Sequence, residues 1–284
     1  MLRNYIVVAV RNLMRRKLYA GISVFGLAFA LALCLLVMGH VSYELSFEDF
    51  HANKDRICRV EAEVTDPEQH YTTARIQPSI GKALADELPD AELVANFRPE
   101  LLRILTINEV KRRVIDEHAT GAYVHHPTAM FTTPEYLKVF SFTVKTGSPD
   151  AILSSPNMAF ITEDAAAKYF PNDDPVGKTI VINERYTCGI AGLLHSLPTN
   201  TQLYCDFVVS YKTLESAPRP DDTLRDPETD YVYLLLRENT DHSSLAARIN
   251  QIASLHLGPE TMKTHRFGVR SLKDIYFVGF SGFE

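Results

Sequence analysis

The residues that most resemble a nucleotide site are Gly177-Lys178-Thr179, because a P-loop ends in glycine, lysine and a hydroxyl residue. A P-loop also needs a glycine five residues before that glycine, so that backbone N–H groups can surround the phosphates. This position is Asn172, and the residues after it are two aspartates and a proline. Negative charge and a missing N–H donor both disfavour an anion here. The sequence therefore predicts a turn before a strand rather than a nucleotide site.

Metal and nucleophile chemistry are equally poorly supported. His118, His125 and His126 lie near one another, but their spacing matches no common metal-binding motif. The chain contains no H-E-x-x-H, C-x-x-C or G-x-S-x-G pattern, and its carboxylates are scattered. We therefore expect structural histidines, no metal, no cofactor and no catalytic residue in this chain.

The composition is that of an ordinary folded protein. The chain has 284 residues, of which 46% are apolar and 23% charged, enough for one large domain or two small ones. The net charge of the chain is −6. An acidic chain lacks the basic surface that phosphate contacts need, so nucleic acid is not expected as a partner. A mean hydropathy of −0.08 excludes a protein made mostly of membrane spans.

Charge is distributed unevenly along the chain. Residues 1–17 contain five basic residues and no acid, so the remaining residues carry a formal charge of −11. Residues 18–43 then contain no Asp, Glu, Lys or Arg. As a helix, these residues would be about 39 Å long, whereas the hydrocarbon core of a bilayer is about 30 Å thick. We predict a transmembrane helix over residues 18–43, with the lipid bilayer as its partner.

The residues that we assign to the membrane anchor are Tyr19, Gly26, Leu31, Leu36 and Val41. Three alternatives fit the segment less well. A buried helix of a soluble protein seldom runs this long without a charge. A cleavable signal peptide has a shorter apolar region that ends in a small-residue cleavage site. A lipoprotein signal at residues 31–34 would need glycine or alanine where Leu33 stands.

The flanking charges predict the orientation of this helix. Basic residues precede it, and three acids, Glu44, Glu48 and Asp49, follow it. The positive-inside rule then places residues 1–17 in the cytoplasm and residues 44–284 outside the membrane. The cytoplasmic basic flank consists of Arg11, Arg15, Arg16 and Lys17. Residues 2–16 have apolar positions at helical spacing, which fits either an amphipathic helix on the membrane surface or an extension of the membrane helix.

The body after residue 44 is predicted to be α+β, with two subdomains. Short runs rich in Val, Ile, Tyr and Phe predict strands. These are residues 57–64, 102–107, 110–115, 140–145, 179–182, 186–192, 207–210 and 231–237. Helical spacing and capping residues predict helices over 78–88, over 163–170 after a Thr162 cap, and over 243–257. Residues 217–227 form either a linker between the subdomains or a solvated loop.

The four cysteines lie at positions 34, 58, 188 and 205. Cys34 falls within the predicted membrane helix, which leaves three cysteines in an oxidising compartment. Cys188 lies on one predicted strand and Cys205 just before the next, and a hairpin-like connection joins the two strands, so these cysteines could form a disulfide. Buried free thiols are the other expectation.

An ordered series of segments resembles the MacB/FtsX-like ABC transporter permeases. Near the apolar run the segments are RNL (11–13), RRKL (15–18), FGLA (25–28), YELSFEDFH (43–51) and DRICRV (55–60). In the body they are PEYLKVFSF (134–142), AAKYF (166–170), DPVGKTI (174–180), HSLPTNT (195–201) and SLKDIYF (271–277), the last similar to the strand that ends the family's periplasmic core domain. Cys58 stands where the family often has tyrosine. The resemblance covers nearly the whole chain.

This resemblance implies a non-catalytic subunit of a bacterial inner-membrane transporter, with its main domain in the periplasm. Its implied partners are a cytoplasmic ABC ATPase, a second permease subunit in a homo- or heterodimer, and a periplasmic protein. Such permeases have three further membrane helices after the periplasmic domain, so we expect this chain to be a fragment that lacks the ATPase-contacting part. Two alternatives remain: a free-standing membrane-anchored periplasmic sensor or binding module, and an anchored envelope enzyme.

Overall fold

The computed structural model describes residues 17–66, 70–114, 127–216 and 229–278, together with Tyr5, Arg11, Met14 and Arg15. The chain divides into two units, residues 1–47 and residues 48–284. The first unit contains the apolar helix, and the second contains the mixed α/β body.

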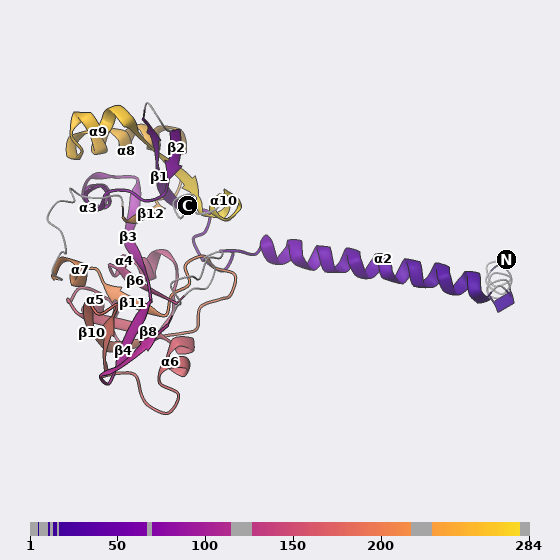
Figure 1. Ribbon diagram of the computed structural model, residues 1–284. Coiled ribbons are helices and arrows are strands. Elements are labelled where there is room, and N and C mark those ends of the chain that lie inside the picture. The colour runs from indigo at the N-terminus through magenta and orange to yellow at the C-terminus, as the bar shows by residue number, and fades with distance from the viewer. Residues whose placement is uncertain are drawn as a thin grey trace. The chain divides into compact units, whose positions relative to one another are not determined.

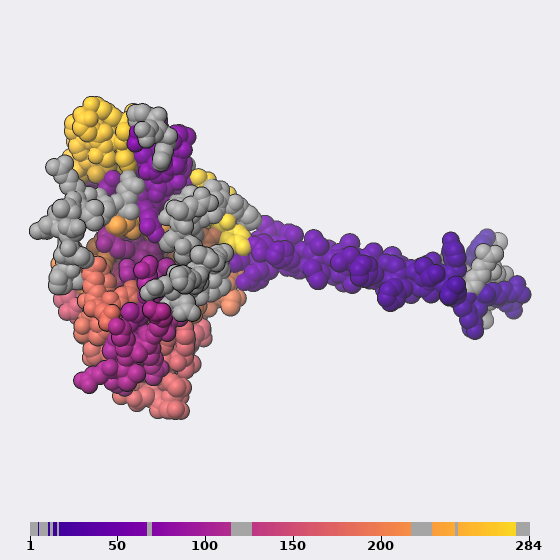
Figure 2. Space-filling model, viewed as in Figure 1, coloured from indigo at the N-terminus to yellow at the C-terminus, as the bar shows by residue number. Residues whose placement is uncertain are grey.

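The apolar helix α2 (Lys17–Glu44) is 28 residues long. Within the described part of the chain it is the one helix long and apolar enough to cross a membrane. None of its residues is buried, and its side chains are drawn in indigo in Figure 2. Apolar residues surround the helix instead of forming a stripe, as expected for a helix exposed to lipid on all sides. The predicted membrane helix is therefore present as a continuous helix.

The strands of the body are short, apart from three of nine residues or more. Their bounds are β1 (Ile57–Thr65), β2 (His70–Thr73), β3 (Ala91–Leu101), β4 (Ile104–Ile107), β5 (Val110–Arg113), β6 (Thr128–Thr132), β7 (Val144–Thr146), β8 (Met158–Thr162), β9 (Thr179–Ile182), β10 (Tyr186–Leu194), β11 (Phe207–Ser210), β12 (Tyr231–Leu236) and β13 (His265–Ser271). The described strands form one 13-stranded sheet in the order β13-β1-β12-β3-β6-β11-β8-β10-β9-β4-β5, with β2 beside β1 and β7 beside β10. The sheet is mixed, because β8–β10 and β6–β11 are parallel pairs among antiparallel ones.

The helices of the body pack against this sheet (Figure 1). Their bounds are α3 (Pro78–Glu87), α4 (Glu135–Val139), α5 (Pro149–Leu153), α6 (Glu163–Tyr169), α7 (Lys212–Ser216), α8 (His242–His256), α9 (Pro259–Thr264) and α10 (Leu272–Val278). Helices α3 and α8 pack against each other and cover β3 and β13, whereas α5 and α6 lie against β8. The yellow α8–α9 segment therefore lies at the β13 end of the sheet, whereas α6 lies against β8 (Figure 1).

Both faces of the central strands are buried. In β12, Tyr231 and Tyr233 belong to one hydrophobic cluster, whereas Val232 belongs to a second. In β11, Val208 belongs to the same cluster as Tyr233, whereas Phe207 belongs to a third. Because side chains alternate along a strand, the first cluster occupies one face across the sheet. The second and third occupy opposite ends of the other face, within one compact unit.

Most of the predicted elements are confirmed, with ends that move by a few residues. The mixed α/β class is confirmed, and α3, α6 and α8 correspond to the three predicted helices. The Thr162 hydroxyl accepts a hydrogen bond from the Ala165 N–H at 3.3 Å, as expected for an N-cap. Predicted strands 102–107 and 110–115 become the hairpin β4–β5. Its two turn residues, Asn108 and Glu109, have positive φ angles of 49° and 64°, as a type I′ turn requires.

Two strand predictions are wrong, the first of them only in part. In the segment 140–145, the Phe140 N–H bonds to the carbonyl of Tyr136 and closes α4, and Ser141 has a φ of 53°, so the strand β7 begins only at Val144. The segment 271–277 is not a strand, because β13 ends at Ser271 and α10 follows it. Residues 217–227, the predicted linker or loop, lie outside the described residues.

The pairing of Cys188 with Cys205 is also wrong. Both are free thiols, as are Cys34 and Cys58. Burial raises the pKa of the Cys58 thiol to about 11 and that of Cys188 to about 12, and it also raises the pKa of Cys205. Thiolates are therefore disfavoured near neutral pH, and these three cysteines behave as small apolar residues of the core.

Candidate functional site

The first residue of the body, Glu48, is buried although it follows a membrane helix by only a few residues. It is 3% exposed and has a φ of 59°, a left-handed conformation that is uncommon for residues other than glycine. Its N–H donates to the carbonyl of Asn200 at 3.0 Å. The body therefore begins at a residue whose backbone conformation is constrained.

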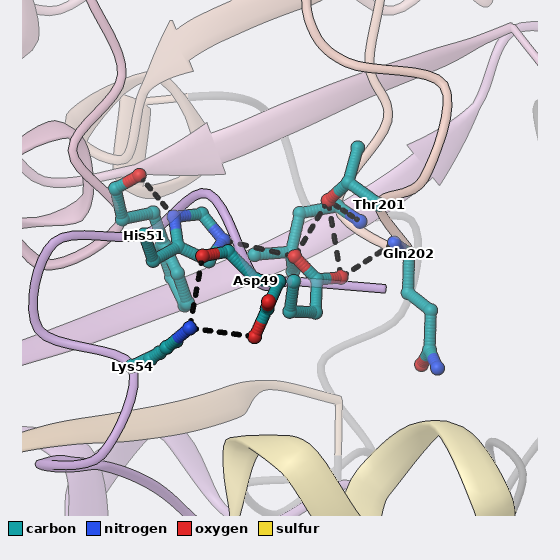
Figure 3. Close-up of polar contacts among 8 residues, drawn as sticks. Asp49, His51, Lys54, Thr201 and Gln202 are labelled. Carbon is teal, nitrogen blue, oxygen red and sulfur yellow. Dashed lines mark hydrogen bonds and ion pairs between the residues drawn. The ribbon is translucent and has the colours of Figure 1, made fainter. Parts of the chain in front are cut away.

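The carboxylate of Glu48 is bound by residues distant in the sequence (Figure 3). The Thr201 hydroxyl donates to it, at 2.9 Å from Oε2 and 3.1 Å from Oε1. The N–H of Gln202 donates to Oε1 at 2.6 Å. Thr201 Oγ1 also accepts a bond from the Leu203 N–H at 3.1 Å, which orients the hydroxyl. These bonds attach Glu48 to the connection between β10 and β11, residues 195–206.

His51 attaches the same segment to a second part of the body. Its ring is fully buried and lies between the Glu48 carboxylate and the carbonyl of Phe140 (Figure 3). The Nε2–Oε2 distance to Glu48 is 2.8 Å, and the Nδ1–O distance to Phe140 is 2.5 Å. The rings of Phe140 and Phe142 lie 5.5 and 5.8 Å from that of His51. His51 is therefore held by both polar and aromatic contacts.

Both ring nitrogens of His51 take part in hydrogen bonds. A carbonyl oxygen can only accept, so Nδ1 of His51 carries the proton that is donated to Phe140. Nε2 then faces a carboxylate oxygen, and two lone pairs at 2.8 Å would repel each other. A hydrogen bond therefore joins Nε2 of His51 to Oε2 of Glu48. We call Glu48, His51, Thr201 and Gln202, with the carbonyl of Phe140, the junction network.

The start of the 195–206 connection is attached at a different place. Glu163, the first residue of α6, accepts from Nδ1 of His195 and from the N–H of Ser196, both at 3.2 Å. Lys145 Nζ donates to Glu163 at 2.5 Å. The hydrogen bond from Lys145, followed by that from Ser196, lowers the pKa of Glu163 to about 2. Carboxylates therefore hold both the beginning and the later part of this connection.

The site residues predicted from the sequence are not members of the junction network. The anchor residues Tyr19, Gly26, Leu31, Leu36 and Val41 lie along α2 and are exposed. Among the basic flank, Arg11, Arg15 and Lys17 are helical and exposed, whereas Arg16 lies outside the described residues. His118, His125 and His126 also lie outside them. Gly177 forms a turn with a φ of 85° directly before β9, as the sequence predicts.

The sequence patterns did not predict the junction network, although they covered both of the segments that form it. Glu48 was assigned only to the acidic flank of the membrane helix, and it is instead buried in the body. A glutamate and a histidine three residues apart, just after an apolar span, were the available signal. Their partner, Thr201, is 153 residues from Glu48, a pairing that spacing cannot reveal. Within the described residues, no group of three or more His, Cys, Asp or Glu could hold a metal ion.

Comparison with known proteins identifies similar domains. The family described as the MacB-like periplasmic core domain matches residues 20–252. A domain of a putative permease protein from Porphyromonas gingivalis has a TM-score of 0.62 at 17% identity, with 78% of this chain and 91% of that chain covered. The periplasmic region of MacB from Actinobacillus actinomycetemcomitans has a TM-score of 0.53 at 12% identity, with 79% and 92% covered.

A third solved structure is also similar. The extracellular domain of the noncanonic ABC-type transporter YknZ from Gram-positive bacteria has a TM-score of 0.50 at 14% identity, with 75% of this chain and 99% of that chain covered. No curated protein matches this chain. At these identities the solved structures show a shared fold, and the family match extends it across the apolar helix and most of the body.

Proposed function

Because this chain belongs to the MacB-like periplasmic core domain family of ABC transporter permeases, we propose that it passes ATP-driven motion from the membrane to its extracytoplasmic body. The observation that carries the proposal is the extent of the family match, which begins inside α2 and continues through the body to residue 252. The motion would serve export of a substrate or action on a periplasmic protein. ATP hydrolysis would belong to a separate cytoplasmic ATPase.

In this role, residues 1–17 would lie in the cytoplasm, residues 18–43 in the membrane and residues 44–284 in the periplasm. The basic flank would hold the N-terminus at the cytoplasmic face of the inner membrane. Two subunits would pack through α2, where Gly21, Gly26 and Gly39 have open space around the position of a Cβ atom. Glycine at such positions lets membrane helices approach closely.

The junction network supports this role because it would resist a pull from the membrane helix. Glu48 lies four residues after the end of α2, so a displacement of the helix would act on it through a very short segment. Its bonds to Thr201 and Gln202 would pass the displacement to the 195–206 connection. His51 would pass it to the end of α4, where the carbonyl of Phe140 accepts its bond.

The test uses the native subunit purified from membranes together with its ATPase. A spin label is placed at the exposed α8 residue Leu255 through Leu255→Cys, and distances between the labels of two subunits are measured. We expect ATP with vanadate to change the distance distribution in the parent protein. Glu48→Gln should still bind the ATPase but show a smaller change, because an amide has one accepting oxygen where the carboxylate forms bonds at two.

Glu63→Gln is the matched control, since Glu63 is an exposed carboxylate of β1 outside the junction network. A native complex without any ATPase would contradict the permease function and would favour an anchored sensor or binding module. An unaltered ATP-driven distance change in Glu48→Gln would leave the permease function standing but would contradict the role of the junction network.

A further inference from the structure

A cavity of about 500 Å³ lies in the body, beside strands β3 and β4. Its walls come from the segment before α3, from β3 and β4, from the turn after β9 and from the residue before β12. This volume is within the range of about 300–1,000 Å³ that is typical of small-molecule sites. The lining includes three arginines and three apolar residues: Arg75, Arg98, Arg103, Pro99, Leu101 and Ile104.

The charge of this cavity contrasts with that of the chain. Its lining contains three arginines and one carboxylate, that of Glu100, which gives a formal charge of +2 on a chain of −6. Glu100 accepts a hydrogen bond from the Asn183 amide at 2.8 Å, so part of its acceptor capacity is already used. When Asp230, which is bound to Arg98, is also counted, the formal charge is three minus two, or +1, in an acidic protein.

Arg98 is held in a fixed orientation by a buried partner. Its Nε and one terminal nitrogen both lie 2.7 Å from Oδ1 of Asp230, a residue with no exposed surface. Tyr211 also donates to Asp230, at 2.5 Å. The side chain of Arg98 remains 28% exposed and lines the cavity. Because arginine has five N–H donors in a planar fork, donors beyond those bound to Asp230 remain for a ligand.

Arg103 has no side-chain partner among the described residues, although its backbone is fixed. The Arg103 N–H donates to Oδ1 of Asn183 at 2.9 Å, and the Ile104 N–H donates to the same oxygen at 3.1 Å. Within the described part of the chain, the guanidinium therefore extends from an ordered strand end without a carboxylate partner. Pro99, Leu101 and Ile104 supply an apolar wall beside it.

We propose that this cavity binds an anion in which a carboxylate or phosphate group is attached to an apolar group. The oxyanion is held by Arg98 and Arg103, since guanidinium forks match the two oxygens of such groups. The apolar group lies against Pro99, Leu101 and Ile104. This site would give the extracytoplasmic body a ligand of its own. The inference rests on the cavity alone and does not depend on coupling to an ATPase.

The experiment titrates the full chain in neutral-lipid nanodiscs with phenyl phosphate and with N-acetylphenylalanine. N-acetylphenylalaninamide is the neutral probe of matched shape. We expect at least one of the anions to bind more tightly than the amide, and the tighter anion identifies phosphate or carboxylate as the preferred group. Arg103→Gln should weaken that binding by about tenfold, the usual effect of losing a charge-assisted hydrogen bond.

Arg112→Gln is the matched control, because Arg112 is an exposed arginine of the same hairpin and does not line the cavity. It should leave the affinity unchanged. Equal binding of both anions and the amide would overturn the proposal, and so would equal effects of Arg103→Gln and Arg112→Gln. Either result would leave the distance test of the permease function unaffected, since that test does not involve the cavity.

Discussion

At the scale of single residues, Glu48 is constrained in both its backbone and its side chain. A left-handed conformation costs a non-glycine residue about 1 to 3 kcal/mol, and such positions cluster at functional sites. A buried hydrogen bond adds modest net stability, but removal of one partner leaves a buried polar group without its bond and is destabilising. The junction network therefore specifies one geometry where the chain enters the body, at little gain in stability.

The contribution of Thr201 can be measured by its replacement with valine, which has nearly the same shape. Thr201→Val removes a donor to the Glu48 carboxylate and should destabilise the body by about 1 to 3 kcal/mol. Thr187→Val is the matched control on the exposed side of β10 and should stay within about 0.5 kcal/mol. Denaturant unfolding followed by circular dichroism measures both. Equal effects would show that the Thr201–Glu48 bond contributes nothing measurable.

At the scale of elements, the 195–206 connection is held by carboxylates from two places. Glu163 at the start of α6 binds His195 and Ser196, and Glu48 binds Thr201 and Gln202. A connection held in this way moves with the elements that hold it. It leads directly into β11, a fully buried strand at the centre of the sheet.

The attachment by Glu163 should depend on pH. Its pKa is about 2 in the folded protein and about 4.5 without these contacts, so the contribution to stability is fully present above pH 4.5 and is lost as the pH falls towards 2. Glu163→Gln should lower the melting temperature at pH 7, and the difference from the parent should shrink over that acid range. Glu184→Gln is the control, because Glu184 is an exposed carboxylate that pairs with Lys111 and is not part of the attachment by Glu163. A difference that is constant with pH would contradict this assignment.

The same scale explains which elements could be predicted from the sequence. Runs such as β11 and β12, buried on both faces, are continuously apolar and were found. β3 was missed because it contains charged residues and Pro99, which usually indicates an edge strand or no strand. Here Pro99 lies where β3 has left β12 and pairs only with β6. The junction network was missed because its partners meet only in the fold.

At the scale of the whole molecule, one sheet carries a shared core on one face and two separate cores on the other. The junction network and the cavity are both built in this unit from residues that are distant in sequence. A sequence could therefore predict the long apolar helix, the class of fold and the family. It could not predict the arginine cavity, since Arg75, Asn183 and Thr229 meet the segment 98–104 only in the fold.

The orientation in the membrane is the prediction that concerns the whole chain. Orientation follows basic residues close to a span, so changing Arg11, Arg15 and Arg16 to glutamate should leave the body of many molecules in the cytoplasm. With Leu255→Cys as reporter, a membrane-impermeant maleimide should label the parent in intact spheroplasts and the variant severalfold less. The native cysteines of the body are buried and should react little.

The matched control changes Lys111, Arg112 and Lys212 to glutamate, which alters the net charge equally but far from the span. Charges at that distance contribute little to orientation, so labelling of this variant should match the parent. Detergent-permeabilised cells give the total reactive protein in each case, which separates a change of orientation from poor expression. Normal labelling of the flank variant would mean that the basic residues do not set the orientation. The periplasmic assignment would then rest on the family alone.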